Sequence, residues 1–254
     1  MTHAEKEPIV VLTLADLLYT QGFGTRRLCA GLVQQGLVQI GGQTVTDPHH
    51  ATEAVEGTPF VVQGQPWEYH AKAYIVLHKP TGTECSQKPS AWPSIYTLLP
   101  APLRQRPQKG ALQGVQAIGR LDQDTTGLLI LTDDGPLIHR MASPKHHVPK
   151  VYQITCKHPV DTRQTAQLLA GVVLDDDPRP VKAAACVQTG SHTLDLTLTE
   201  GKYHQVKRMV AAVCNRVDAL HRSRVGAFDL PAGLAPGQWR WLQPDETARL
   251  QHKT

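Results

Sequence analysis

Residues 119–135 read GRLDQDTTGLLILTDDG, a polar loop bracketed by Gly119 and Gly127 and followed by a continuous apolar run. A short apolar run bounded by turn residues predicts a buried strand over residues 128–131. The loop then places the Asp122 carboxylate at the rim of a core, next to Arg120. The competing interpretation is structural, because Asp122 and Asp124 can simply bond backbone N–H groups in a turn.

The end of the same stretch predicts a helix. Asp133 and Asp134 precede Gly135-Pro136, and proline is favoured in the first turn of a helix. We therefore expect a helix that begins with Leu137 and is capped by the two aspartates.

The composition fits one large or two smaller packed domains in water, with 254 residues of which 41% are hydrophobic and 19% charged. No apolar run reaches the roughly 18 residues of a membrane span, and residues 1–8 are polar and do not resemble a secretory signal. The five cysteines are scattered, with no Cys-x-x-Cys pair. We therefore expect a reduced, cytoplasmic protein without a disulfide framework or a zinc ribbon.

The charge is unevenly divided along the chain. Residues 1–70 carry 3 Lys+Arg against 7 Asp+Glu, whereas the remainder carries 23 against 15. The net charge of +8 on the larger part favours a polyanionic partner there.

Residues 1–66 are predicted to form a small unit of two helices and a hairpin. One helix follows Thr13 and stops at Gly22, a second runs from a cap at Thr25 to Gly36, and residues 37–45 form two extended arms about a Gly-Gly turn. Thr25-Arg26-Arg27 and Gly36-Leu37-Val38-Gln39-Ile40-Gly41-Gly42 resemble the S4 RNA-binding domain. Arg26 and Arg27 fit either RNA contact or a solvated helix face.

Turn residues at 64–66 predict a boundary, and residues 72–254 alternate short strands with a few helical stretches. This pattern predicts an α+β domain built on a mainly antiparallel sheet. Within it, alternation from residue 150 onward places Tyr152 and Ile154 on one face of a strand. His146 and His147 point to opposite sides of an extended chain and have no further ligand at metal-site spacing, so we expect no metal.

A second strand and a helix follow in residues 194–213. Leu194, Leu196 and Leu198 alternate with polar residues, and a buried helical stripe then begins at Val206. Lys207 adjoins this stripe, where a partly shielded cation is tolerated beside an opposite charge. Asp122 is the candidate partner, and the pairing would keep its carboxylate ionised. Alternatively, Lys207 could extend along the core edge and meet only water.

Four stretches in this order resemble the RsuA-type pseudouridine synthases. They are Lys79-Pro80-Thr81-Gly82, Gly119 to Leu129, Lys150-Val151-Tyr152 and Glu200 to Met209, and the resemblance extends from the S4-like start to Trp241. Four ordered motifs over nearly the whole chain are specific, whereas any one of them alone is weak. The resemblance identifies residues 1–66 as the S4-like domain and 72–254 as the catalytic domain.

The resemblance implies an isomerase in which Asp122 is the nucleophile that attacks a uridine, without a metal or an organic cofactor. It further implies that Tyr152 stacks on the target base and helps to move the C5 proton, and that Lys207 pairs with Asp122.

The same resemblance implies the RNA contacts. Arg120 would fill the gap that the flipped uridine leaves in the RNA. Lys79 and Arg208 would contact phosphate, and Arg26 and Arg27 would contact RNA from the S4-like domain.

The implied substrate is one uridine of 16S ribosomal RNA, as naked RNA or in a partly assembled small subunit, and we expect a monomer without a membrane partner. Residues 203–208 read Tyr-His-Gln-Val-Lys-Arg, similar to the small-subunit enzymes, whereas large-subunit relatives carry Asn-Arg-Gln-Val-Arg-Arg. Alternatives are a 23S rRNA pseudouridine synthase and a non-catalytic RNA-binding ribosome-assembly protein. A metal-dependent phosphodiesterase that uses Asp122, Asp124, Asp133 and Asp134 is a further alternative.

Overall fold

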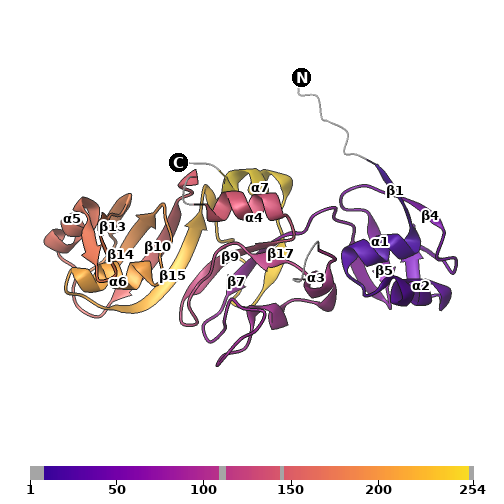
Figure 1. Ribbon diagram of the computed structural model, residues 1–254, viewed down its shortest axis with the longest axis horizontal. Helices are drawn as coiled ribbons and strands as arrows, with labels where there is room; N and C mark the ends of the chain where they lie inside the picture. The colour runs from indigo at the N-terminus through magenta and orange to yellow at the C-terminus, as the bar shows by residue number, and fades with distance from the viewer. Residues whose placement is uncertain (1–8, 109–112, 144–145, 252–254) are drawn as a thin grey trace, which may run out of the picture. The chain divides into compact units, whose positions relative to one another are not determined.

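The computed structural model describes residues 9–108, 113–143 and 146–251 and divides them into two compact units (Figure 1). Unit 1 holds the described residues up to Ala73 and those of Leu99–Gln116, and unit 2 holds Tyr74–Leu98 and the described residues from Ala117 onward. The expectation about a secretory signal in residues 1–8 lies outside the described residues. Within the described part of the chain, no helix has the length and apolar character needed to cross a bilayer.

The two predicted helices of unit 1 are confirmed. Helix α1 (Leu14–Gln21) begins after Thr13, whose hydroxyl accepts a backbone hydrogen bond of 3.1 Å, and ends at Gly22 with a φ of +89°. Helix α2 (Arg26–Gln34) begins after Thr25, which caps it in the same way. Local sequence therefore specifies the start of each helix through a threonine hydroxyl, and the end of α1 through a glycine in the left-handed conformation.

The predicted hairpin is also confirmed. Strands β2 (Val38–Ile40) and β3 (Gln43–Thr44) pair around Gly41 and Gly42, which have φ values of +57° and +75°. The sheet continues in the order β3-β2-β5-β6, with β5 (Pro59–Val62) and β6 (Gln65–Glu68), while β1 (Val10–Thr13) pairs separately with β4 (Ala51–Ala54). Its core contains Leu14, Leu17, Leu18, Cys29, Val33, Val38, Phe60 and Val62.

A distant segment completes unit 1. Helix α3 (Ala101–Gln105) is followed by Arg106, which is only 2% exposed. Its Nη1 donates to Gln21 Oε1 (2.8 Å) and its Nη2 to the His70 carbonyl (2.7 Å). The buried guanidinium therefore bonds both α1 and the segment that follows β6. The domain limits of 1–66 and 72–254 remain predictions. Residues 99–116 belong to unit 1 of the structure, although they fall within the second predicted range.

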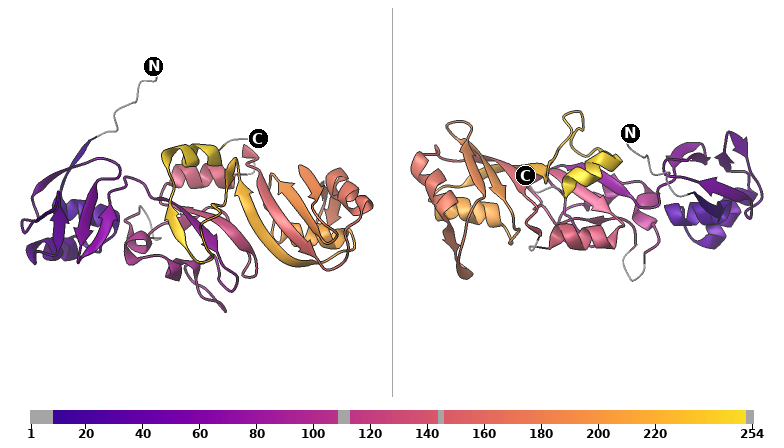
Figure 2. Two further views of the ribbon diagram at one scale, coloured as in Figure 1. Left: turned by 180° about the vertical axis from the view of Figure 1, so that it is seen from behind. Right: turned by 90° about the horizontal axis from the view of Figure 1, so that it is seen from above.

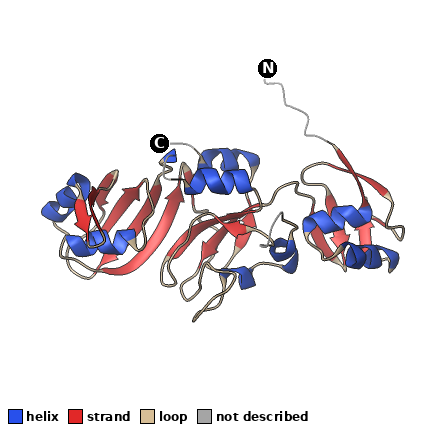
Figure 3. Cartoon of the chain, in the orientation of Figure 1, coloured by secondary structure: helices blue, strands red, loops and turns tan. Residues whose placement is uncertain are grey.

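Unit 2 is built on one large sheet, whose strands are coloured red in Figure 3. Their order is β13-β14-β10-β15-β9-β7-β17, and all neighbours are antiparallel except β15 and β9, which confirms the predicted α+β class with a mainly antiparallel sheet. The strands of this path are β7 (Tyr74–Lys79), β9 (Thr126–Thr132), β10 (Lys150–Cys156), β13 (Ala185–Gln188), β14 (Thr193–Leu198), β15 (Val217–Val225) and β17 (Trp239–Trp241).

The remaining elements of unit 2 are short. They are β8 (Gln116–Ala117), β11 (Val172–Leu174), β12 (Asp177–Val181), β16 (Phe228–Asp229), the 3-10 helix η1 (Ile95–Leu98) and the helices α4 (Gly135–Ala142), α5 (Thr162–Ala170), α6 (Gln205–Ala212) and α7 (Pro244–Leu250).

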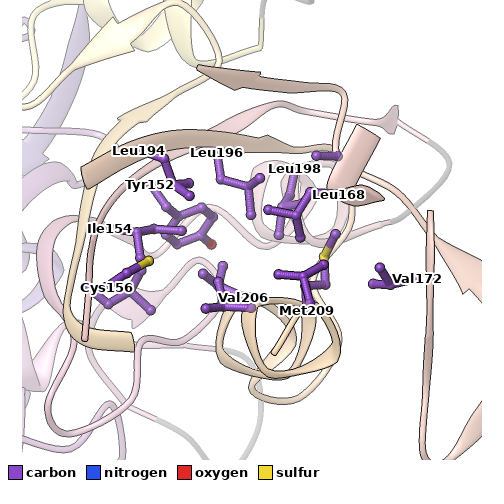
Figure 4. Close-up of a cluster of buried hydrophobic side chains, with 14 of the residues drawn as sticks. Tyr152, Ile154, Cys156, Leu168, Val172, Leu194, Leu196, Leu198, Val206 and Met209 are labelled. Atoms are coloured by element: carbon purple, nitrogen blue, oxygen red, sulfur yellow. The ribbon is translucent and has the colours of Figure 1, made fainter. Parts of the chain in front are cut away.

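Two hydrophobic clusters line the sheet of unit 2. In one, side chains of β10 and β14 pack with Val206 and Met209 of α6, and Tyr152 projects among them (Figure 4). In the other, Leu128 and Ile130 of β9 pack with residues of α4 and α7, the two helices that lie side by side in Figures 1 and 2. The alternating burial of β10 and β14 and the buried stripe of α6 confirm the periodicities predicted from the sequence.

The parallel contact between β9 and β15 requires a glycine. Gly127 has a φ of +110°, and a Cβ there would lie 2.3 Å from the carbonyl oxygen of Arg222. A left-handed residue without a side chain therefore lets the two backbones approach. This contact brings the loop before β9 towards the C-terminal strands of the sheet.

The predicted cap of α4 is wrong in two respects. The helix begins at Gly135 rather than Leu137, and Asp134, although it precedes the helix, makes no side-chain cap. Its Oδ2 instead accepts a hydrogen bond of 2.8 Å from the Tyr74 hydroxyl of β7. The Asp134 side chain, which the local sequence predicted to cap the helix, thus bonds a residue that is distant in the sequence.

Candidate active site

The Asp122 loop meets the start of α6. Lys207 Nζ lies 3.1 Å from Asp122 Oδ2 and 2.6 Å from Asp124 Oδ1, and His204 Nε2 lies 3.3 Å from the other Asp122 oxygen. The Asp122 and Lys207 side chains are 28% and 27% exposed, so the pair is accessible from solvent without being fully hydrated. The predicted Asp122–Lys207 contact is present, and Asp124 and His204 join it.

Lys79 is hydrogen-bonded to the backbone of this loop. It is fully buried, and its Nζ donates to the carbonyl oxygens of Pro80 (3.0 Å), Gln123 (3.3 Å) and Thr125 (2.9 Å). Burial lowers the pKa of this amine, and nearby negative charges oppose the effect. This position differs from the phosphate contact predicted for Lys79, because a fully buried amine has no surface to offer to a solvated phosphate.

The cation and the carboxylates stabilise each other's charged forms. Burial alone would lower the pKa of Lys207, but hydrogen bonds to Asp124 and Asp122 and their charges outweigh burial and raise it. Burial would raise the pKa of Asp124, and the hydrogen bond and charge of Lys207 reverse the effect, so that pKa lies below its usual value. The arrangement can therefore present an ionised carboxylate at neutral pH without a metal ion.

Tyr152 lies at the edge of a cavity on the same unit. The residue is 9% exposed and packs in the cluster between β10, β14 and α6. It also lines a cavity of about 690 Å³, together with the exposed Arg120 and the half-buried Lys150. An aromatic ring fixed by its neighbours at a cavity wall can stack on a planar ligand.

The four aspartates considered for metal-dependent hydrolysis are not gathered together. Asp122 and Asp124 precede β9 and Asp133 and Asp134 follow it, so about 20 Å of extended strand separates the two pairs. Among the described residues, no three His, Cys, Asp or Glu side chains are placed to hold a metal ion. The geometry does not provide the centre that the phosphodiesterase alternative requires.

A family model described as RNA pseudouridylate synthase matches residues 73–212, more than half of the chain, and an S4 domain model matches residues 12–51. The chain belongs to the RsuA-type pseudouridine synthases. This synthase is 38% identical over 242 residues to the ribosomal small subunit pseudouridine synthase A of Salmonella typhimurium, which covers 92% of this chain and 98% of the relative. The protein of the same name from Escherichia coli K12 is 37% identical with the same coverage.

A solved structure described as the crystal structure of pseudouridylate synthase agrees with this assignment. Its TM-score is 0.65 at 33% identity, and the match covers 94% of this synthase and 99% of that chain. The protein is therefore an isomerase that carries an S4 domain, as the ordered motifs predicted.

The S4 domain presents its two arginines at the start of α2. Arg26 and Arg27 are both exposed. Arg26 forms an ion pair with Asp16, and its guanidinium lies 4.2 Å from the centre of the Tyr19 ring. Arg27 is thus the more available of the two predicted RNA contacts.

Arg208 lies on α6 next to Lys207 but faces a different neighbour. It pairs with Asp176 and donates to the Tyr203 carbonyl at 3.3 Å, and the hydrogen bond to Asp176 raises the pKa of the guanidinium further. Its predicted phosphate contact would compete with this ion pair, which stands on the surface and is weak in water.

Three residues near the site of this synthase were not assigned to the pseudouridine synthase reaction from the sequence, although Asp124 was considered as a metal ligand. His204 adopts a left-handed φ of +48°, stacks on Tyr203 with ring centres 3.8 Å apart, and reaches Asp122. Asp124 was interpreted as a turn residue. Arg222 is 3% exposed and lines the same cavity as Tyr152. For His204 the sequence held one signal, its position three residues before Lys207.

Proposed function

We propose that this synthase converts one uridine of 16S ribosomal RNA into pseudouridine, with Asp122 as the nucleophile. The observation that carries the proposal is the Asp122 carboxylate held 3.1 Å from Lys207 at the solvent-accessible end of the loop. The substrate is supported by the relatives, whose names specify the small ribosomal subunit and which match nearly their whole length.

The proposed reaction begins with the ionised Asp122. Its attack leads to cleavage of the bond between ribose C1′ and uracil N1, after which the base turns and C5 bonds to C1′. N1 gains a proton and C5 loses one in the last step, so the product is an isomer of the substrate and no cofactor enters the balance. Lys207 stabilises the carboxylate before attack and each time it is regenerated.

Tyr152 and Arg120 serve the base and the RNA in this proposal. The Tyr152 ring is fixed by the core behind it and faces the cavity, so it can stack on the extruded uracil. Arg120 is exposed at the rim of the same cavity, where a planar cation can occupy the space that the uridine leaves. The S4 domain supplies Arg27 and Arg26 as further contacts.

Comparison of ribosomal RNA from cells with and without the gene tests the substrate. We expect one pseudouridine in 16S RNA to disappear with the gene and to return when the purified protein acts on that RNA. Loss of a 23S pseudouridine with unchanged 16S RNA would show that the substrate is 23S RNA. Unchanged modification of both RNAs would overturn the proposed function.

Tyr152→Phe tests the role of the hydroxyl. The variant keeps the ring, so we expect normal RNA binding and normal detachment of the base, but roughly tenfold slower appearance of product if the hydroxyl helps to move the proton. The measurement is single-turnover conversion of RNA with hydrogen or deuterium at C5 of the target. An isotope effect should appear in the variant, and a wild-type rate without one would leave Tyr152 a stacking role only.

A further inference from the structure

The cavity beside Tyr152 is strongly cationic. Its volume is about 690 Å³, and its walls carry one acidic side chain against several basic ones. The charged residues that line it are Arg120, Lys150, Arg179, Lys202, Arg222 and Glu200.

Two of these cations are built into the sheet rather than lying on its surface. Tyr152 of β10 and Arg222 of β15 are direct partners across the two strands. Lys150 lies two residues before Tyr152 and so emerges on the same face of β10. The register of two central strands therefore places an ammonium, a guanidinium and the aromatic ring on one wall.

Neither of the two cations has an anionic partner among the described residues. Arg222 is 3% exposed and donates from Nε to the Leu128 carbonyl at 2.8 Å, and Lys150 Nζ donates to the Val148 carbonyl at 3.0 Å. The one acidic group on the cavity wall, Glu200, accepts a hydrogen bond from Gln205 (2.7 Å). Cations held out of water without a counter-charge destabilise a fold, so their presence points to a ligand that supplies the charge.

We propose that this cavity binds a phosphate of the RNA backbone next to the target uridine, with Lys150 and Arg222 as its ligands. The inference rests on the proposed function, because the cavity shares Tyr152 with the reaction. The fork of the Arg222 guanidinium and the ammonium of Lys150 both suit phosphate oxygens, and one phosphodiester would compensate the two cations in part. A phosphate held here would fix the ribose of the extruded nucleotide near Asp122.

The protonation of Lys150 gives the site a dependence on pH. Burial, and then the charge of Arg222, lower the pKa of Lys150 to about 8. The ammonium therefore loses its proton as the pH rises through about 8, and a bound phosphate opposes that loss. The charged and titratable groups that line the cavity with Lys150 are Arg120, Tyr152, Arg179, Lys202, Arg222 and Glu200.

A scan of the RNA backbone tests the proposal. Single methylphosphonate linkages, which remove one negative charge, are placed at each position around the target uridine, and affinity and turnover are measured with the full chain. With the wild-type protein we expect one linkage to weaken binding roughly ten- to hundredfold, the effect of losing a charged hydrogen-bonded contact. In Lys150→Met the unmodified RNA should bind about tenfold more weakly, and the sensitive linkage should no longer differ from its neighbours.

Matched variants separate the site from general electrostatics and from misfolding. Lys150→Arg keeps the charge and should restore the sensitivity, while removing the decline in affinity above pH 8. Lys157→Met removes an exposed lysine just beyond β10 and should leave the sensitive linkage unchanged. Thermal melting of each variant shows whether it is folded, and the wild-type scan keeps the test valid if Lys150→Met unfolds.

Two outcomes would overturn the inference. One is a wild-type scan without a sensitive linkage, and the other is the same sensitive linkage in Lys150→Met. In the first case, thermal stabilisation by inorganic phosphate that depends on Lys150 would show that the cavity binds a free phosphate compound instead. Wild-type conversion of unmodified 16S RNA in the same assay shows that the proposed function stands, whereas its absence would count against that function instead.

Discussion

Asp122→Asn is expected to abolish pseudouridine formation, with a loss of at least about a thousandfold in turnover, because an amide cannot replace a carboxylate as nucleophile. The substitution keeps the size of the side chain, and Lys79 still bonds two carbonyls of the loop, those of Gln123 and Thr125. Folding and RNA affinity should therefore stay close to wild type. Turnover is measured on a 16S fragment, and affinity by titration of the same RNA.

Asp124→Asn is the matched control. Asp124 contacts the same Lys207 nitrogen, at 2.6 Å, but is 52% exposed and is not the proposed nucleophile. We expect a loss of no more than about tenfold, as for other partly exposed ion pairs. Turnover that survives in Asp122→Asn but not in Asp124→Asn would transfer the nucleophilic role to Asp124.

Lys207→Met is expected to reduce turnover roughly ten- to hundredfold and to move the acid limb of the pH–rate profile to higher pH. The variant removes the cation that lies beside the Asp122 and Asp124 carboxylates, and the partly exposed position of Lys207 limits the size of the effect. The pKa of Asp124, which Lys207 holds below its usual value, should rise towards or above that value. Carboxyl titration by NMR measures this shift independently of activity.

Lys207→Arg distinguishes the effect of the positive charge at position 207 from the effect of the shape of the lysine side chain. It retains a cation at the same place on α6, so the pH profile should return to that of the wild type even if the rate does not fully recover. A Lys207→Met profile that superimposes on the wild-type profile would show that the ion pair does not control the reaction.

Features encoded over a few residues were predictable. The hydroxyl caps at Thr13 and Thr25, the Gly41-Gly42 turn and the alternation around Tyr152 each specify a local conformation, and the structure contains all of them. The Asp122–Lys207 contact was also expected, although its two residues come from distant motifs. That prediction depended on the order of the motifs, not on local physics.

Features that depend on distant partners were not predictable. Nothing near Lys79 in the sequence indicates that its amine bonds the Asp122 loop, because the two loop carbonyls that it contacts belong to residues more than forty positions away. Asp134 was assigned to a helix cap and instead bonds Tyr74, and Arg106 anchors a later segment on the S4-containing unit. In each case a single side chain makes a long-range polar contact that leaves no periodic pattern.

The place of β9 in the sheet also determines the order in which the parts of the site are synthesised and brought together. Its neighbour β15 is made much later, since Thr126 and Leu220, which share a hydrogen bond, are 94 positions apart. During synthesis the Asp122 loop is therefore complete long before Lys207, His204 and β15 exist to contact it. Contacts between such distant parts form late in folding. A nascent chain thus carries the Asp122 loop without its partners Lys207, His204 and β15 until β15 has left the exit tunnel.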